Sequence, residues 1–168
     1  KYYELRNMMA KYSDKPLIDV PEPPMPIITI PEINFTHYAP LFSSLPEPVA
    51  IDKIKTMEEF DQGWGSILYR TTVDEHNGQS LLQVFEPHDY AQIFVNGNLI
   101  GAMDRRVREN TVVLPSLKQG DTLDILVEAM GRINFGRAIK DFKGITDSVL
   151  LNGKHLNHWL VYNLPDDY

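Results

Sequence analysis

Acidic side chains that stand in pairs or in turns are the first candidates for chemistry in this chain. Two carboxyl groups facing each other across a cleft can divide the roles of proton donor and nucleophile or base. The candidates are Glu58-Glu59, Asp121, Asp124, Asp141 and Asp166-Asp167. The two pairs stand in polar, turn-like contexts, which predicts solvated side chains, and Asp121 follows a glycine as a turn residue does. No spacing sets two of these groups across a pocket, so we expect no catalytic dyad.

Histidine pairs could bind a metal, and one pair is present. His155 and His158 are three residues apart, whereas two zinc ligands on a helix are usually four apart and need a third ligand. Their segment is typical of a turn that enters a strand. The chain has no cysteine, which excludes disulfides and thiolate metal sites. We therefore expect no metal and no cofactor.

A short polar and aromatic stretch, Met130-Gly131-Arg132-Ile133-Asn134-Phe135-Gly136, follows an expected strand. Two glycines bracket it, and glycine permits backbone angles that are closed to other residues. Arg132, Asn134 and Phe135 in one tight loop could clamp a polar ligand or a neighbouring domain. The alternative is a structural corner in which Arg132 bonds to backbone carbonyls, and the residues alone leave both interpretations open.

Other aromatic and basic residues carry weaker signals. Trp64 lies between two glycines but lacks the lysine and following helix of a phosphate-binding loop. Trp64 and Tyr90 are candidate sugar platforms, and a place in the core or at a sheet edge is the alternative. Arg105-Arg106-Val107-Arg108 has an acidic residue on each side, which favours a solvated loop.

Charge and length exclude several classes of partner. The chain has 168 residues, with 16 Lys and Arg against 23 Asp and Glu, so its formal net charge is −7. Nucleic acids and anionic membranes attract a basic face, and no apolar run approaches the roughly 18 residues of a membrane span. We therefore expect no nucleic acid and no membrane as partners. The chain starts at Lys1 without a signal peptide, which predicts a piece of a longer protein.

The first third of the chain differs from the rest in its proline content. Nine of the 12 prolines lie between residues 16 and 48, and proline removes a backbone donor and fixes φ. Residues 20–26 are therefore expected to form an extended strap, and residues 27–36 an edge strand or a break at Pro31. Before them, Tyr2, Leu5 and Met9 share one face of a predicted helix over residues 2–11. So short a helix is marginal in water and needs a second surface to cover this face.

After Pro48 the pattern is that of β-structure. Turn signals separate many short apolar segments, and Asn96-Gly97 is the strongest hairpin signal because both residues tolerate positive φ. The predicted strands are 66–73, 81–85, 90–95, 99–103, 111–114, 122–129, 148–151 and 159–162. Many short strands with almost no helical pattern predict an all-β fold, an antiparallel jelly-roll β-sandwich.

Five segments also carry motifs in a characteristic order. They are residues 65–72 (Gly-Ser-Ile-Leu-Tyr-Arg-Thr-Thr), 89–97 (Asp-Tyr-Ala-Gln-Ile-Phe-Val-Asn-Gly), 123–136 (Leu-Asp-Ile-Leu-Val-Glu-Ala-Met-Gly-Arg-Ile-Asn-Phe-Gly), 141–145 (Asp-Phe-Lys-Gly-Ile) and Trp159. In this order they resemble the family 35 glycoside hydrolases, the β-galactosidases. The resemblance covers residues 41–165.

The resemblance implies a galactose-binding-domain-like jelly roll that follows a catalytic (β/α)₈ barrel. Residues 1–12 would be a remnant of the last barrel helix, 13–48 a proline-rich connecting segment with an edge strand, and 49–168 the β-sandwich. In the family, two barrel glutamates hydrolyse terminal β-galactosyl residues with retention. Neither glutamate is in this chain, so the resemblance implies a non-catalytic accessory domain that is inactive alone. Its partners would be the barrel of the same parent chain and the galactoside substrate of the parent.

The resemblance also assigns candidate roles to residues. The loop with Arg132, Asn134 and Phe135 is expected at the rim of the barrel's active site, where Phe135 could stack on a sugar but has no hydroxyl to bond one. An autonomous galactoside-binding module with Trp64, Tyr90 or Phe135 as platforms is the alternative. An extracytoplasmic location, whether periplasmic, secreted or lysosomal-type, is favoured over a cytoplasmic one.

Overall fold

The computed structural model describes residues 1–20 and 28–166 and divides the chain into two units, Lys1–Tyr38 and Ala39–Tyr168. In the first unit the predicted helix is confirmed as α1 (Tyr2–Ala10). Tyr2, Leu5 and Met9 are more than half exposed, so the described residues of the first unit leave the apolar face of the helix open. Arg6 NH2 donates to the carbonyl of Ile18 at 2.5 Å and ties the next segment to the helix.

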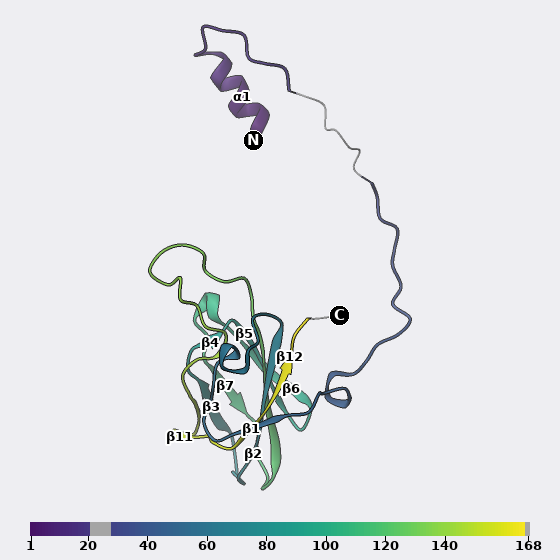
Figure 1. Cartoon of the computed structure of the whole chain (residues 1–168), viewed down its shortest axis with the longest axis vertical. Helices are drawn as coiled ribbons and strands as arrows, with labels where there is room; N and C mark the ends of the chain where they lie inside the picture. Colours follow the sequence, from purple (N-terminus) through teal and green to yellow (C-terminus); the bar gives the residue numbers. More distant parts are fainter. Residues whose placement is uncertain (21–27, 167–168) are drawn as a thin grey trace. The chain divides into compact units, whose positions relative to one another are not determined.

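The second unit is an antiparallel β-sandwich, which confirms the predicted fold class (Figure 1). Its larger sheet has the spatial order β1 (Val49–Ile51), β12 (Trp159–Leu164), β2 (Ser66–Val73), β8 (Asp121–Glu128), β5 (Tyr90–Val95) and β6 (Asn98–Asp104). The smaller sheet has the order β11 (Lys154–His155), β10 (Val149–Leu151), β3 (Ser80–Val84) and β7 (Thr111–Leu114), and β4 (Pro87–His88) pairs with β9 (Gly144–Ile145). The 3₁₀ turn η1 (Leu41–Ser43) precedes β1, whereas η2 (Met57–Phe60) and η3 (Arg105–Val107) lie between strands.

The predicted strands occur within a few residues of their expected bounds. Asn96 and Gly97 join β5 to β6 with φ of 49° and 77°, as the hairpin signal predicts. β8 lies inside the larger sheet between β2 and β5. Its outward-facing Asp124 is buried as well, in keeping with a strand covered on both faces.

The core lies between the inner faces of the two sheets. The larger sheet contributes Tyr69, Ile125 and Trp159, and the smaller sheet contributes Leu82 and Leu114, all at most 1% exposed. Burying each large apolar side chain stabilises the fold by roughly 1.5–3 kcal/mol. The rings of Tyr69 and Trp159 meet edge to face with centroids 6.4 Å apart.

The proline-rich segment departs from expectation. The sequence predicts an edge strand or a break at Pro31 within residues 27–36. Residues 28–36 are exposed and form no strand, so the edge strand is wrong for them, because Pro31 lacks a backbone donor. The sheet edge is instead Val49–Ile51, which pairs with β12. The strap expected at 20–26 lies, apart from Val20, outside the described residues. Among the described residues, no helix is long and apolar enough to cross a membrane.

Candidate functional site

The stretch with Arg132, Asn134 and Phe135 belongs to a long loop, residues 129–143, between β8 and β9. In Figure 1 this loop projects from the sandwich as the yellow-green trace near β4 and β5. β8 fixes where the loop starts and β9 fixes where it ends, so both stems emerge from paired strands. Residues 134–140, which we call the tip, are all exposed.

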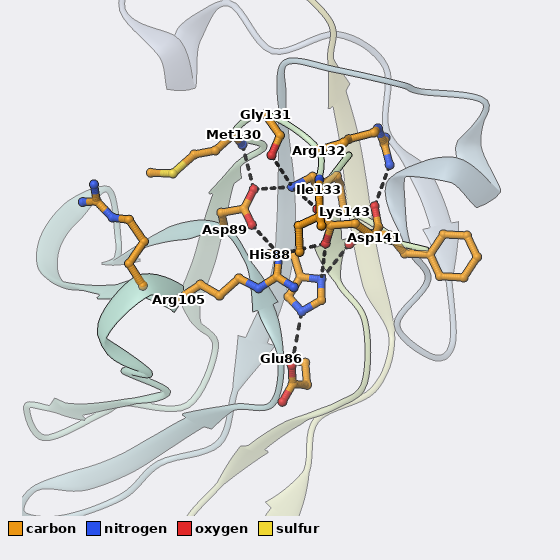
Figure 2. Close-up of polar contacts among 12 residues, drawn as sticks. Glu86, His88, Asp89, Arg105, Met130, Gly131, Arg132, Ile133, Asp141 and Lys143 are labelled. Atoms are coloured by element: carbon orange, nitrogen blue, oxygen red, sulfur yellow. Dashed lines mark hydrogen bonds and ion pairs between the residues drawn. The ribbon is translucent and has the colours of Figure 1, made fainter. Parts of the chain in front are cut away.

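Beneath the loop lies a cluster of four charged residues, Asp89, Arg105, Asp141 and Lys143, which we call the loop network (Figure 2). Lys143 Nζ lies 2.5 Å from Asp89 Oδ2 and 2.9 Å from Asp141 Oδ2. Arg105 NH1 lies 2.7 Å from Asp89 Oδ1 and 2.8 Å from Asp141 Oδ1. The side chains of Lys143, Asp89 and Asp141 are at most 7% exposed, and that of Arg105 is 29% exposed. Two anions and two cations therefore neutralise each other, with only Arg105 reaching water.

The same carboxylates bind the backbone of the loop. Met130 N donates to Asp89 Oδ2 at 2.8 Å, and Ile133 N donates to Asp141 Oδ2 at 3.2 Å. Lys143 Nζ also donates to the carbonyl of Gly131 at 3.4 Å. The loop network therefore holds the first stem of the loop through its peptide groups and the second stem through the side chains of Asp141 and Lys143.

His88 closes the network on the side of β4. Its Nδ1 lies 2.6 Å from the carbonyl oxygen of Phe142 and 3.7 Å from Asp141 Oδ1. A carbonyl only accepts, so Nδ1 carries the proton. Nε2 lies 3.2 Å from Glu86 Oε2.

The environment keeps the network acids ionised. Burial alone would raise the pKa of Asp141, but the hydrogen bonds from Lys143 and Arg105 outweigh burial and lower it to about 2. At Asp89, burial likewise raises the pKa, but the hydrogen bonds from Lys143 and Arg105 leave it lowered overall. Neither acid can hold a proton to donate near neutral pH, and both are occupied by cations. The cluster therefore suits positioning rather than acid–base catalysis.

Arg132 forms a second brace at the base of the loop. It donates to the carbonyls of Asp141 at 2.7 Å and Gly63 at 2.8 Å. Its NH1 also lies 2.6 Å from Glu58 Oε1. Of the two interpretations left open by the sequence, these contacts favour the structural corner for Arg132, since its guanidinium is occupied within the domain.

Glu58, on η2, departs from the prediction of a solvated side chain. Besides Arg132 it binds the backbone N of Lys143 at 3.1 Å, and its side chain is 25% exposed. Burial raises its pKa, but the hydrogen bond and charge of Arg132 and two backbone donors leave it lowered overall. Its neighbour Glu59 is exposed, as predicted, and accepts from Thr56 N at 2.9 Å.

The other sequence-predicted site residues are spread over the surface. Phe135 is 89% exposed, the preceding residue Asn134 is also exposed, and Trp64 is 58% exposed. Tyr90 is half-buried at the start of β5. The described aromatic contacts join no two of these rings. Gly63, beside Trp64, is linked to Arg132, and Asp89, beside Tyr90, belongs to the loop network. The segments of both rings therefore reach the base of the loop.

Of the two bracketing glycines, only Gly136 has the expected special backbone angle. Its φ is +97°, whereas Gly131 is absent from the described residues with positive φ. A Cβ built on Gly131 meets nothing within 4 Å. The special backbone angle that the two bracketing glycines permit is therefore used at Gly136 and not at Gly131.

The remaining polar candidates have structural partners. Asp121 accepts from Lys118 N at 2.8 Å, as a turn residue should. His158 Nδ1 lies 3.0 Å from Asp52 Oδ1, and His155 is on β11. Across residues 1–20 and 28–166, no group of three His, Asp or Glu side chains could hold a metal. Asp166 is exposed, and Asp167 lies outside the described residues.

The loop network is the feature that sequence reasoning missed. Asp89, Asp141 and Lys143 each stood in a motif without a role, and the arginine cluster was interpreted as solvated, which is wrong for Arg105. Asp89 and Lys143 are 54 residues apart, so no local spacing reveals the contact. The available signal was a charged residue at the start of each of two motifs, such as Asp89 immediately before β5.

Comparisons with known proteins agree with the motifs. Residues 55–165 match the family described as "Beta-galactosidase, first all-beta domain". The chain is 33% identical over 98% of its length to a β-galactosidase of Xanthomonas manihotis and 32% identical over 99% to that of Homo sapiens. It is 34% identical over 98% of its length to β-galactosidase-1-like protein 3 of Rattus norvegicus. It spans about a quarter of these relatives, 25–27% of their length.

A solved structure shows a weaker likeness. The crystal structure of a GH2 β-galacturonidase from Eisenbergiella tayi is similar over 71% of this chain and 23% of that chain. The TM-score is 0.42 and the sequence identity 13%, values too low to support an argument about function.

Proposed function

Because the chain belongs to the family of first all-β domains of β-galactosidases, we propose that it serves as a non-catalytic support of a β-galactosidase, next to the catalytic barrel. The match over residues 55–165 carries this proposal. The whole of this chain spans about a quarter of the relatives' length. The other three quarters leave ample length for a barrel of at least about 200 residues.

The chemistry of the described residues supports a non-catalytic role. A retaining glycosidase needs two carboxyl groups about 5–5.5 Å apart, one of them able to donate a proton. Asp89 and Asp141 are bound by Lys143 and Arg105 and have lowered pKa values. The hydrolysis of terminal β-galactosyl residues is therefore assigned to glutamates of the barrel.

The 129–143 loop is the part proposed to shape the rim of the active site. Its stems are bound by buried charges, and its tip presents Phe135, which is 89% exposed. A ring held on a firm base can stack on the sugar beyond the cleaved bond at little cost in conformational entropy. Asn134 stands beside it, and Arg132 holds the base rather than the substrate.

The first test is the activity of this 168-residue chain on a nitrophenyl β-galactoside. We expect no turnover above the buffer rate, because the proposed acids are absent. Substantial turnover would overturn the assignment as non-catalytic. Calorimetric binding of galactose or lactose by the chain alone would instead favour an autonomous binding module.

The second test uses a full-length β-galactosidase that contains this domain. Phe135→Ala should lower kcat/KM for an extended galactoside by about 2- to 10-fold, as expected for a lost aromatic contact of about 0.5–1.5 kcal/mol. The value for an aryl galactoside should stay nearly constant. Phe35→Ala, at a ring that is 93% exposed, is the matched control. Equal losses on both substrates would refute the rim role.

A further inference from the structure

The tip of the loop combines two cations with exposed apolar side chains. Residues 134–140 read Asn-Phe-Gly-Arg-Ala-Ile-Lys, with two cations and no acid, in a chain of net charge −7. We propose that Phe135, Arg137, Ile139 and Lys140 form a docking surface for a carboxylate-bearing face of another domain in the same polypeptide.

The apolar side chains of the tip are exposed to solvent, where they add no stability to an isolated domain. Phe135 is 89% exposed, Ile139 61% and Phe142, at the second stem, 41%. Single exposed apolar residues are ordinary, but here three occur within eight positions of one projecting loop. Exposed apolar patches mark interaction sites when polar groups surround them.

The two cations supply the polar part of the docking surface. Neither Arg137 nor Lys140 forms an ion pair with any residue that the structure describes. Lys140 Nζ lies 5.1 Å from the ring centroid of Phe142, a contact that keeps the ammonium close to the apolar groups. Aromatic residues and arginine are the types enriched where proteins contact each other, and the charge favours an acidic partner.

The base of the loop makes the tip suitable for docking. Asp89 and Asp141 bind backbone groups of the first stem, and Lys143 sits between both acids. Only the seven exposed tip residues lie between these fixed points. A segment whose ends are already fixed loses less conformational entropy when it binds, so a small surface can suffice.

The identity of the partner follows from length and charge. The chain spans 25–27% of its curated relatives, so proteins of this kind carry other domains on the same chain. Covalent linkage gives a high effective concentration, which allows a patch of four side chains to dock. This inference rests on the proposed function, in which a catalytic domain is the neighbour.

Zero-length cross-linking tests the contact in a full-length β-galactosidase that contains this domain. A carbodiimide joins a lysine amine to a carboxylate only where the two meet. We expect mass spectrometry to find Lys140 joined to an Asp or Glu outside the 168 residues. Lys118, exposed at the opposite end of β8, is the control and should give no such product.

Two variants and a salt series sharpen this experiment. Lys140→Arg keeps the charge but lacks the amine, so the product should disappear. Arg137→Glu should lower its yield by repelling the partner acid, and raising ionic strength from 0.1 to 1 M should do the same because the Debye length falls from about 10 to 3 Å.

Defined outcomes would overturn the docking proposal. One is a product that joins Lys140 only to acids of this chain, and another is no Lys140 product at all. A third is found with Arg137→Glu when no cross-link forms in the parent enzyme: KM changes for anionic galactosides but not for neutral ones. That result would make the tip a contact for the substrate. The Phe135 kinetics test the proposed function separately, since the cross-link can form whether or not Phe135 selects substrates.

Discussion

Two groups of buried charges in this domain stabilise very different pieces of backbone. Arg70 on β2 and Asp124 on β8 lie directly opposite each other in register. Arg70 binds both oxygens of Asp124, at 2.7 and 3.2 Å, and the rings of Phe42 and Tyr162 lie 5.8 and 5.3 Å from its guanidinium carbon. The loop network instead gathers Asp89, Arg105, Asp141 and Lys143 from separate segments around an irregular loop.

The two groups differ in whether strand pairing or charged side chains satisfy the backbone hydrogen bonds. Around Arg70 and Asp124, the strand ladder already satisfies the backbone. Residues 129–143 have almost no ladder, and a buried peptide N–H without a partner is costly. Carboxylates of Asp89, Asp141 and Glu58 accept from the backbone of Met130, Ile133 and Lys143. These acids thus hold the loop backbone in place, and the cations offset the cost of burying Asp89 and Asp141.

The largest expected effect is the loss of the central cation. Lys143→Met leaves Asp89 and Asp141 buried with only Arg105, and breaking a buried ion pair costs about 3–5 kcal/mol. Asp124→Asn leaves Arg70, whose side chain is 26% exposed, still able to reach water, so about 1–3 kcal/mol is expected. Urea unfolding measures both. Equal losses would erase the distinction between the two groups.

A smaller effect separates the two groups by pH. The pKa of Asp141 is about 2 in the folded domain, against its ordinary value of 3.8. A lowered pKa contributes stability that is present above pH 3.8 and disappears as the pH falls through 2. The shift corresponds to about 2 kcal/mol.

Asp141→Asn removes this titration, and Asp124→Asn is the control. The difference in unfolding free energy between wild type and Asp141→Asn should shrink by about 2 kcal/mol between pH 5 and pH 2. In Asp124→Asn, the unfolding free energy should still decrease between pH 5 and pH 2, because Asp141 is unchanged. A pH-independent difference for Asp141→Asn would show that its charge does not stabilise the loop.

The smallest expected effects compare two phenylalanines. Phe42 on η1 meets the Phe94 ring edge to face at 5.1 Å and lies over Arg70, so Phe42→Ala should cost about 1–2 kcal/mol. Phe135→Ala, on the exposed tip, should change the stability of this chain by less than about 0.5 kcal/mol. Thermal melts of the 168-residue chain measure both, and a large loss for Phe135→Ala would mean that the tip is part of the fold.

The prolines show how a local rule reaches its limit. Pro31 correctly allowed for a break, yet the alternating apolar residues around it still indicated an edge strand. A strand needs a partner, and β12 pairs with Val49–Ile51, which forms the edge of the larger sheet. Strand propensity depends on the residues of one segment. Which segment pairs at the edge of a sheet depends on other segments that are far apart in the chain.

The amino-acid sequence by itself determined the strands, the Asn96-Gly97 hairpin and the acidic character of the domain. These depend on neighbours a few residues apart, on side-chain alternation and on the φ that each residue tolerates. Only the tertiary structure decided that Asp141 meets Arg105 across 36 residues and that Lys143 meets Asp89 across 54. Charges attract any opposite charge alike, so their partners are chosen by the packing of the sheets that carry them.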